Sequence, residues 1–436
     1  MRVAFYTLGC KVNQYETQIM EQMFSAEGFD IVDSASGSAD IYVVNSCTVT
    51  ATGDKKSRQV LRRFKRQNPG AAAVLTGCYP QAFPEAAQQI PEADVITGTY
   101  RRSAVLEAVK EYLSTGKRVV RITPMERKGE NRARFEEMRA GQMNERTRAF
   151  VKIQDGCDRF CSYCIIPTAR GPVRSKPLEE IRAELTALAE NGYREAVLVG
   201  INLPCYGSDL GLGLLDAVKT ACAIPGLERV RLGSLEPELL TPEDIAAMAA
   251  MPNLCPQFHL SLQSGCDATL KRMNRRYDTA EYRRIVRDLR SAFENASITT
   301  DIMVGFPGED EGEFRESLAF AEEIAFAKAH VFMYSPRPGT RAANMPGQVD
   351  SAAKERRSGE MIRATERTRR KFLESQIGRR EQVLFETNTS GGLYHGYTRN
   401  YTPVEAASLE NLCGQMREVT ITGLTEDGQG CFGAAE

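Results

Sequence analysis

The sequence predicts an α/β protein built in three parts, and three observations support this prediction. Short apolar runs alternate with amphipathic stretches over residues 1–115, a strand-then-helix repeat fills residues 146–373, and glycine-punctuated β-rich runs occupy residues 374–436. Alternating strands and helices indicate parallel sheets covered by helices, and closely spaced β-runs indicate a small barrel. We therefore expect an N-terminal doubly wound parallel-sheet domain, a central partial (β/α)6 barrel and a small C-terminal antiparallel β-barrel.

The first region has apolar runs of strand length with helical patterns between them. The strands are expected at Val3–Thr7, Ile41–Asn45, Ala73–Thr76 and Val95–Thr97. The helices are expected at Glu16–Glu27 and Thr52–Gln67. Residues 116–145 lose this periodicity and become rich in Arg and Glu, which is typical of a linker or a long surface connection.

The central region repeats a strand followed by a helix. Its strands are expected at Ala149–Gln154, Ala196–Gly200, Arg229–Gly233, Phe258–Leu262, Ile298–Val304 and His330–Tyr334. Its helices are expected at Leu178–Asn191, Pro242–Ala250, Ala280–Asn295 and Glu311–Ala325. In such a barrel the chemistry lies at the C-terminal ends of the strands. The last region carries short β-rich runs such as Gln382–Glu386 and Glu418–Thr422, and its size is that of a binding module.

The bulk composition narrows the possible function classes. The 436 residues are 42% hydrophobic and 26% charged, an ordinary globular balance, and no apolar run approaches the roughly 20 residues of a membrane span. The N-terminus lacks the apolar region of a signal peptide, so we expect a cytoplasmic protein that works without a membrane. The net charge of −1 excludes a general basic field. Two basic clusters, Arg58–Arg66 and Lys354–Arg380, have the pattern of solvated helix faces.

Three of the 12 cysteines form the strongest motif in the chain. Cys157, Cys161 and Cys164 follow the first predicted barrel strand, where barrel chemistry belongs. Cysteine thiolates are the usual ligands of iron–sulfur clusters, and three of them leave one iron of a cubane open to a small molecule. The alternative is structural zinc, which needs four protein ligands, and no fourth Cys or His follows nearby.

The spacing Cys-x3-Cys-x2-Cys resembles the signature of radical S-adenosylmethionine enzymes. The resemblance implies that the open iron binds S-adenosylmethionine, which is cleaved to methionine and a 5′-deoxyadenosyl radical. It also implies a set of cofactor-binding residues at the motif and at the ends of the barrel strands. These residues are Tyr163 for the adenine, Gly200 and Asn202 for the methionine end, Gln263 and Ser264 for the ribose, and Val304 and Gly305 as further support for the adenine.

Three other cysteines share one local setting. Cys10, Cys47 and Cys78 each come just after a predicted strand of the first domain. The C-terminal ends of parallel strands lie along one edge of a sheet, so the three thiols are expected to converge there. The alternative is that they are ordinary cysteines, because free cysteine is often buried.

The short sequence motifs around these cysteines, together with the barrel motif, resemble those of the methylthiotransferase family of radical S-adenosylmethionine enzymes. The motifs are Thr7–Gln14, Asn45–Val49 and Thr76–Cys78, and the resemblance covers nearly the whole chain. The resemblance implies a second [4Fe-4S] cluster on Cys10, Cys47 and Cys78, and an RNA-binding TRAM module at the C-terminus. Within the family, residues 7–17, which include Lys11-Val12, and residues 152–157 look most like the bacterial branch that acts on threonylcarbamoyladenosine. The alternatives are the isopentenyladenosine branch, the ribosomal-protein branch and, more distantly, a non-catalytic iron–sulfur RNA-binding protein.

The expected reaction inserts a methylthio group at C2 of threonylcarbamoyladenosine at position 37, next to the anticodon. The implied partners are the anticodon stem-loop of tRNA, a reductase or flavodoxin-type electron donor, and a sulfur donor, and the sequence identifies neither donor. No conventional acid/base or nucleophile arrangement can be assembled, so the chemistry is assigned to the cofactors. His259 and His330 fall on predicted strands and are expected to be core residues. The remaining cysteines are interpreted as structural: Cys205, Cys222, Cys255, Cys266, Cys413 and Cys431.

Overall fold

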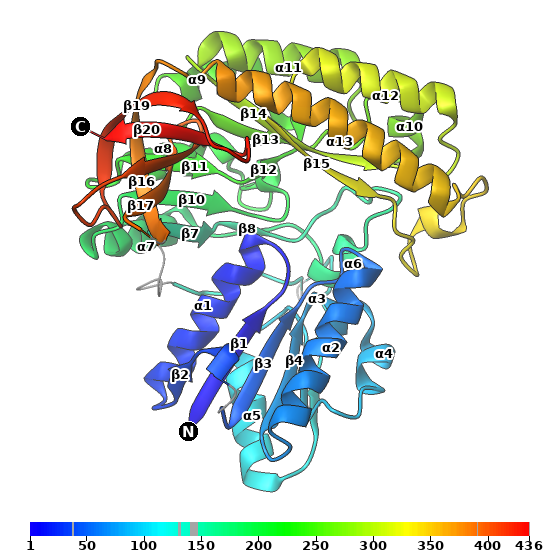
Figure 1. Cartoon of the computed structure of the whole chain (residues 1–436). Coiled ribbons are helices and arrows are strands. Elements are labelled where there is room, and N and C mark those ends of the chain that lie inside the picture. The colour runs from blue at the N-terminus through cyan, green and yellow to red at the C-terminus, as the bar shows by residue number, and fades with distance from the viewer. Residues whose placement is uncertain (37–38, 130–131, 140–146, 390, 436) are drawn as a thin grey trace.

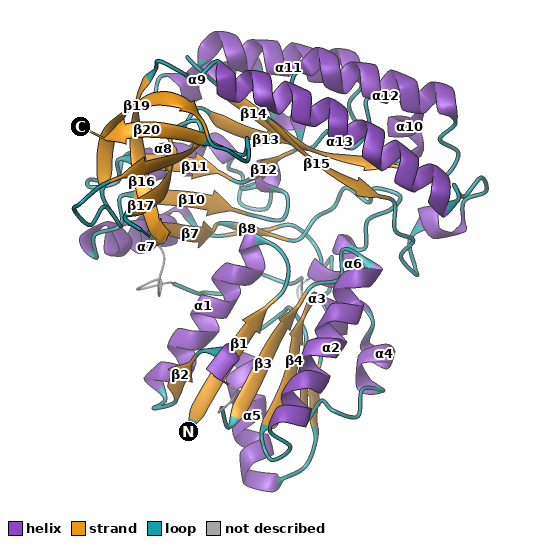
Figure 2. Ribbon diagram, viewed as in Figure 1, coloured by secondary structure: helices purple, strands orange, loops and turns teal. Residues whose placement is uncertain are grey.

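The structure is a computed structural model and describes residues 1–36, 39–129, 132–139, 147–389 and 391–435. Three domains follow one another along the chain (Figure 1). The N-terminal sheet domain lies below a larger central domain, and a small β-barrel packs at one end of that central domain, as the strand and helix colours of Figure 2 also show. None of the described helices is long and apolar enough to cross a membrane.

The N-terminal domain is a parallel sheet with helices on both faces, as predicted. Its strands lie in the order β2-β1-β3-β4-β5-β6. The strands are β1 (Arg2–Thr7), β2 (Asp30–Val32), β3 (Ile41–Ser46), β4 (Ala72–Gly77), β5 (Val95–Thr97) and β6 (Val119–Arg121). The helices are α1 (Lys11–Ala26), α2 (Ala51–Gln67), α3 (Cys78–Ala82), α4 (Pro84–Gln88) and α5 (Ser103–Thr115).

Alternating side chains of the strands supply the two cores of this domain. Val43 on β3 packs on the face covered by α1 and α5, whereas Val44 packs on the face covered by α2. The chain leaves β1 for β2 on one side and returns to β3 on the other, so the switch point of the sheet lies between β1 and β3. Ligands of open α/β sheets bind at this point, and Cys10 and Cys47 come just after these two strands.

The segment predicted as a linker contributes to the fold. Strand β6 pairs with β5 and extends the sheet into residues 116–145. Farther along, the carboxylate of Glu136 accepts hydrogen bonds from the backbone N–H groups of Arg102 and Ser103, at 2.7 and 3.2 Å, and so holds the start of α5. Other parts of the predicted linker, residues 130–131 and 140–145, lie outside the described residues. The three boundaries between the predicted segments 1–115, 116–145, 146–373 and 374–436 stay predictions.

The central domain is the predicted partial barrel. Its strands are β7 (Arg148–Lys152), β10 (Glu195–Val199), β11 (Arg229–Leu232), β12 (Ser234–Leu235), β13 (Gln257–Leu260), β14 (Ser297–Val304) and β15 (Lys328–Met333). Only Gly233 separates β11 from β12, and these two strands join a sheet of three strands to a sheet of four. A short ribbon of β8 (Gln154–Asp155) and β9 (Arg174–Ser175) extends the first strand.

The barrel helices cover the outer face of these strands and form the largest core with them. The long helices are α7 (Leu178–Glu190), α8 (Leu214–Cys222), α9 (Pro242–Ala249), α11 (Thr279–Ala292), α12 (Glu311–Ile324) and α13 (Ser351–Glu374). Two short helices, α6 (Ile166–Arg170) and α10 (Asp267–Arg272), follow the cysteine loop and β13. Asp278 and Asp310 begin α11 and α12 by accepting hydrogen bonds from backbone N–H groups at 2.8 and 2.9 Å.

The C-terminal domain is a closed barrel of five strands in the order β16-β17-β18-β20-β19. The strands are β16 (Arg380–Thr389), β17 (Leu393–Thr398), β18 (Pro403–Ala407), β19 (Met416–Leu424) and β20 (Cys431–Ala435). The prediction of antiparallel pairing needs one correction, because β18 and β20 are parallel. A ring with an odd number of strands cannot alternate direction all the way round, so one parallel pair is required.

This small barrel docks on the N-terminal ends of the central strands. Arg148, at the start of β7, donates to the Tyr401 hydroxyl at 2.9 Å. Arg229, at the start of β11, donates to the Tyr397 carbonyl at 3.1 Å. Ser297, at the start of β14, donates to the Asn400 carbonyl at 2.5 Å. The opposite, C-terminal ends of the strands are therefore left for the N-terminal domain.

Candidate active site

The predicted cysteine triplet lies on the loop that leaves β8 at the C-terminal end of the barrel. The backbone N–H of Cys157 donates to the Gly171 carbonyl at 3.0 Å, and the N–H of Cys164 donates to the Cys161 carbonyl at 2.9 Å. These bonds fold the loop tightly and leave all three cysteines half-buried. Burial raises the pKa of each thiol. A raised pKa favours the protonated thiol. Metal coordination deprotonates a thiol outright, so bound iron would offset this effect of burial.

Two side chains from other loops of the barrel domain, after β10 and after α10, donate hydrogen bonds to these sulfurs. The amide of Asn202 lies 3.6 Å from Cys157 Sγ, and the Arg275 guanidinium lies 3.3 Å from Cys161 Sγ. Donors to cysteine sulfur are the groups that tune iron–sulfur clusters. Within the described chain no group of Cys, His, Asp and Glu side chains is arranged to hold a single metal ion. A four-iron cluster binds its thiolates through separate irons, so it needs a wider arrangement than zinc does.

Two predicted cofactor residues carry buried oxygens without a partner. Asn202 Oδ1, after β10, and Gln263 Oε1, after β13, accept no hydrogen bond from the described residues. Buried polar atoms are nearly always paired, so both positions fit a polar ligand such as S-adenosylmethionine. Gln263 also has a positive φ of 66°, which is uncommon for a residue with a side chain and costs roughly 1–3 kcal/mol.

The other predicted cofactor residues lie at the same ends of the strands. Tyr163 packs its ring edge-on against Phe306, with centroids 6.3 Å apart, and Phe306 directly follows Gly305. Val304 is buried at the end of β14. Gly200 lets the Gln154 side chain approach, because a Cβ at 200 would lie 2.8 Å from its oxygen. The Ser264 hydroxyl accepts a hydrogen bond from the backbone N–H of Cys266 at 3.3 Å, so it stabilises its own turn.

The three N-terminal cysteines converge at the sheet edge, as expected from the ends of their strands. The thiols of Cys10 and Cys78 lie 3.7 and 4.0 Å from the same oxygen, Asn13 Oδ1. A Cβ at Gly9 would lie 3.2 Å from Cys47 Sγ, so glycine is required for this approach. Burial raises the pKa of Cys78 to about 12, although the nearby Arg170 cation opposes this shift. Cys10 is exposed, whereas Cys78 is buried.

A buried group of charges joins this cysteine site to the barrel, and we call it the interdomain charge network. Glu16 on α1 pairs with Lys152 of β7 at 2.7 Å and with Arg170 of α6. Asp155 pairs with Lys152 at 2.6 Å and with Arg174 at 2.8 Å. The network also contains Arg102, Asn13 and Thr76.

The cations of this network hold its carboxylates ionised. Burial by itself raises the pKa of Glu16, but Arg102, Arg170 and Lys152 outweigh that effect and lower its pKa well below the usual range. Arg170 also donates to Cys78 Sγ at 3.3 Å, although it belongs to the barrel domain. The sequence carries no signal for this network, because its members are isolated charges in separate elements and only the fold brings them together.

A cavity of about 620 Å³, which we call the interdomain cavity, lies between the loop after β1 and the inner face of the barrel. Cys10 and Lys11 line it from the N-terminal domain, and Gly200 lines it from the barrel. One space is therefore bordered by both predicted functional regions. The remaining polar lining comes from Gln14, Ser234, Gln257, His259, Thr299, Asp301, Lys328, His330 and Tyr401.

The expectation that the two strand histidines are core residues is wrong. Both His259 and His330 line the interdomain cavity, and His259 contacts Thr299 at 3.1 Å and Asp301 at 3.3 Å. The partial barrel leaves its inner face open, so inward-pointing positions meet a polar space. The signal was present as alternation of polar residues along β13, β14 and β15, since every second residue of a strand points the same way.

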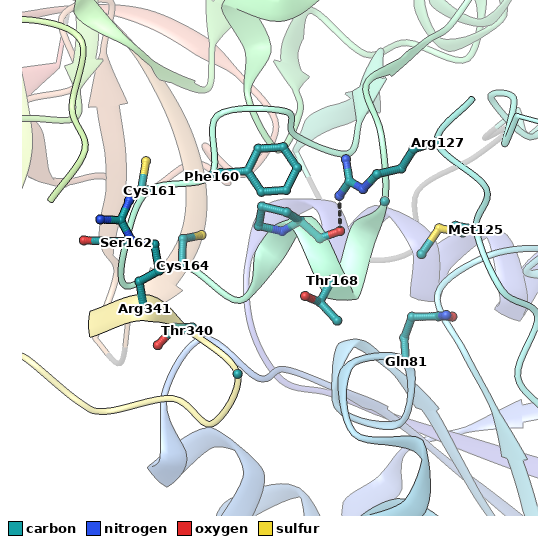
Figure 3. A pocket seen from close by; sticks show the side chains of 13 residues that line it. Gln81, Met125, Arg127, Phe160, Cys161, Ser162, Cys164, Thr168, Thr340 and Arg341 are labelled. Atoms are coloured by element: carbon teal, nitrogen blue, oxygen red, sulfur yellow. Dashed lines mark hydrogen bonds between the residues drawn. The ribbon is translucent and has the colours of Figure 1, made fainter. Parts of the chain in front are cut away.

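A second cavity, of about 420 Å³, borders two of the barrel cysteines (Figure 3). Cys161 and Cys164 line it together with Phe160, whose ring is exposed. The Arg127 guanidinium lies 4.8 Å from the centre of that ring and pairs with Asp158 at 2.6 Å. Residues of the predicted linker therefore cover the loop that carries the cysteine triplet.

Acidic residues pair with part of each predicted basic cluster. In the run Lys354–Arg380, they pair with Arg356, Arg357, Arg367, Arg370 and Arg380. In the run Arg58–Arg66, Arg62 pairs with Glu92 and Lys65 pairs with Asp94. Each run is therefore in part an ion-paired helix surface.

Comparison with known proteins agrees with this architecture. Residues 151–321 match the Radical SAM superfamily, and residues 2–98 match the Uncharacterized protein family UPF0004. The solved structure of the radical S-adenosylmethionine methyltransferase TsrM from Kitasatospora setae shares the fold, with a TM-score of 0.58 and 15% identity over 90% of this chain and 77% of that chain. The fold and the site thus define a radical S-adenosylmethionine enzyme, a class that uses S-adenosylmethionine and a [4Fe-4S] cluster.

Relatives that match over nearly their full length identify the family within this class of enzymes. Threonylcarbamoyladenosine tRNA methylthiotransferase MtaB of Thermotoga maritima is 36% identical over 98% of this chain and 95% of its own length. The Bacillus subtilis protein of the same name is 37% identical over 96% and 93%. A tRNA-2-methylthio-N(6)-dimethylallyladenosine synthase of Pelotomaculum thermopropionicum is 33% identical over 95% and 94%. The chain belongs to the radical S-adenosylmethionine tRNA methylthiotransferase family.

Proposed function

We propose that this enzyme inserts a methylthio group at C2 of N6-threonylcarbamoyladenosine at position 37 of tRNA. The interdomain cavity carries the proposal, because Cys10 of one triplet and Gly200 at the edge of the barrel site border the same space. A target base in this cavity can meet both halves of the site without moving between them. The choice of base is supported by relatives that bear this name at 36% and 37% identity, against 33% for the dimethylallyladenosine relative.

Within this proposal, Cys157, Cys161 and Cys164 hold one [4Fe-4S] cluster and Cys10, Cys47 and Cys78 hold a second. When bound, the first cluster and S-adenosylmethionine supply the radical that activates the C2–H bond of adenine. Asn202 and Gln263 provide the unpaired polar atoms that orient the cofactor. Tyr163, Gly200, Ser264, Val304 and Gly305 shape the rest of its site. The interdomain charge network holds α1, and with it Cys10, against the barrel.

The same proposal names the partners. The anticodon stem-loop is bound, with the small barrel acting as a TRAM module, and the target base leaves its stack at a cost of a few kcal/mol. A reductase or flavodoxin-type protein delivers electrons, and a separate donor renews the sulfur. These partners place the reaction in the cytoplasm.

Nucleoside mass spectrometry tests the substrate. We expect a strain that lacks its own methylthiotransferase for threonylcarbamoyladenosine to regain 2-methylthio-threonylcarbamoyladenosine when it expresses this chain. A matched strain expresses the Cys161→Ala variant and is expected to gain none. Appearance of 2-methylthio-dimethylallyladenosine in its place, in a host that lacks both activities, would contradict the proposed substrate.

We also expect Arg275→Leu to make the barrel cluster harder to reduce. The Arg275 cation lies 3.3 Å from Cys161 Sγ and stabilises the extra negative charge of a reduced cluster. Loss of a hydrogen bond to a charged group costs roughly 1.5 kcal/mol, which lowers the potential by about 60 mV for one electron. Redox titration followed by electron paramagnetic resonance measures the shift, with Arg276→Leu, its exposed neighbour, as the control. A potential that stays level or rises in Arg275→Leu would refute the assignment.

A further inference from the structure

The interdomain cavity has an uneven distribution of charge. Among the described residues that line it, Lys11 and Lys328 are cations and Asp301 is the one carboxylate. Asp301 already lies 3.3 Å from the His259 ring. Neither lysine makes a side-chain hydrogen bond or ion pair with any described residue. The positive charge of the lysines in this cavity is therefore not paired with negative charge from the described residues.

No carboxylate of the described residues forms an ion pair with Lys11 at the base of the barrel. Its side chain is exposed to the cavity although protein surrounds it. Burial, together with the Arg148 and Arg231 cations, lowers the pKa of Lys11 to about 8, and Glu195 is the carboxylate that opposes this shift. Glu195, however, is shared among three arginines, with N–O distances of 3.0 Å to Arg231, 3.5 Å to Arg229 and 4.0 Å to Arg148. An anionic ligand would supply the missing partner.

The position of Lys11 beside Cys10 relates this charge to the substrate. In adenine, C2 and C6 flank N1 on one edge of the base, and C6 carries the N6 nitrogen. A base that presents C2 to the Cys10 side of the cavity therefore carries its N6 substituent into the same space. The threonylcarbamoyl substituent ends in a free carboxylate, whereas a dimethylallyl substituent has no charge. Cys10 and Lys11 are adjacent in the chain. One therefore lies on the side that receives C2, and the other lies on the side that receives the N6 substituent.

We propose that Lys11 binds the carboxylate of the N6 substituent and that Lys328 adds positive charge to the same space, so that the interdomain cavity selects adenosines whose N6 group is anionic. This inference rests on the proposed function and adds the chemical feature by which the substrate is chosen. It also specifies the open form of the threonylcarbamoyl group, because cyclisation consumes the carboxylate. Lys11 and Lys328 act here as specificity residues and take no part in bond making.

Paired substrates test the inference on the reconstituted holoenzyme. One synthetic anticodon stem-loop carries N6-threonylcarbamoyladenosine, and the other carries the same group with its carboxylate converted to the methyl amide. We expect the wild-type KM for the acid to be at least tenfold lower, roughly the effect of losing one partner of a buried charge pair. Lys11→Gln is expected to raise the KM for the acid to that for the amide, and Lys11→Arg is expected to keep most of the preference.

Further variants separate recognition from damage to the cysteine site. Lys328→Gln, on β15 and not adjacent in the chain to any of the six predicted cluster ligands, is expected to lose part of the same preference. Lys117→Gln, an exposed lysine beyond α5, controls for general charge and is expected to change neither KM. Iron per chain is measured for each variant. Equal KM values for acid and amide in the wild type, or a full preference in both glutamine variants, would overturn the inference alone. Methylthiolation of neither stem-loop by the wild type would overturn the proposed function as well.

Discussion

Cys161→Ala will abolish the release of 5′-deoxyadenosine from S-adenosylmethionine, whereas Cys47→Ala will keep part of that release and lose methylthio insertion. The two residues belong to separate triplets in different domains. Cys161 lies on the barrel loop, where Arg275 and Asn202 donate to the sulfurs of the triplet. Cys47 lies at the end of β3 in the other domain, against Gly9. Removing a thiolate should therefore disable one centre and leave the other folded.

The measurement is a pair of yields from the same anaerobic reaction. We expect 5′-deoxyadenosine to fall by more than about 100-fold in Cys161→Ala, beyond the 10–100-fold that loss of an outer-shell partner costs. In Cys47→Ala the methylthiolated nucleoside should be absent while 5′-deoxyadenosine persists. Cys413→Ala, in the C-terminal domain, is the matched control and should change neither yield. Equal loss of both products in the two variants, with native circular dichroism, would contradict the division of roles.

The sequence is sufficient to predict those features of the fold that a local pattern determines. Apolar runs of strand length locate the sheet and the barrel, and the rule that parallel strands end at one edge correctly predicts that Cys10, Cys47 and Cys78 converge. Helix starts are less well placed: α1 begins at Lys11, five residues before the predicted Glu16, because the loop at Gly9 and Cys10 leads directly into it. The parallel pairing of β18 and β20 is not predicted, because pairing of distant strands leaves no local trace.

Features that depend on contacts between domains are beyond the sequence. Glu16 and Arg170 are 154 positions apart, and nothing in either segment marks them as partners. The interdomain cavity escapes prediction for a related reason. The alternation of polar residues indicates that His259 and His330 share one side of their strands, but only an incomplete barrel leaves that side open to a cavity. Lys11 is typical of one family branch, but its place in the cavity requires the docking of the two domains.

Glu16→Gln is expected to loosen the docking of the N-terminal domain and to separate radical formation from methylthio insertion. Glu16 is fully buried and is the shared anion of Arg102, Arg170 and Lys152. Removing one partner of a buried ion pair typically costs about 3–5 kcal/mol, because it leaves uncompensated charge. Since those cations lower the pKa of Glu16, its stabilising effect is present above the unfolded pKa of about 4.3 and is lost as the pH falls toward its folded pKa.

Glu27→Gln provides the matched control on the same helical segment, because Glu27 pairs with Lys110 at 2.6 Å with both side chains about half exposed. Surface pairs of this kind contribute at most about 1 kcal/mol. We therefore expect a large fall in the melting temperature for Glu16→Gln and almost none for Glu27→Gln at neutral pH. Hydrogen exchange should rise along α1 in the first variant only. Its yield of methylthiolated nucleoside per 5′-deoxyadenosine should also drop, because Cys10 begins the helix that Glu16 anchors to the barrel. An unchanged product ratio, or equal shifts of the melting temperature in the two variants, would show that the interdomain charge network does not fix the relative positions of the two cysteine sites.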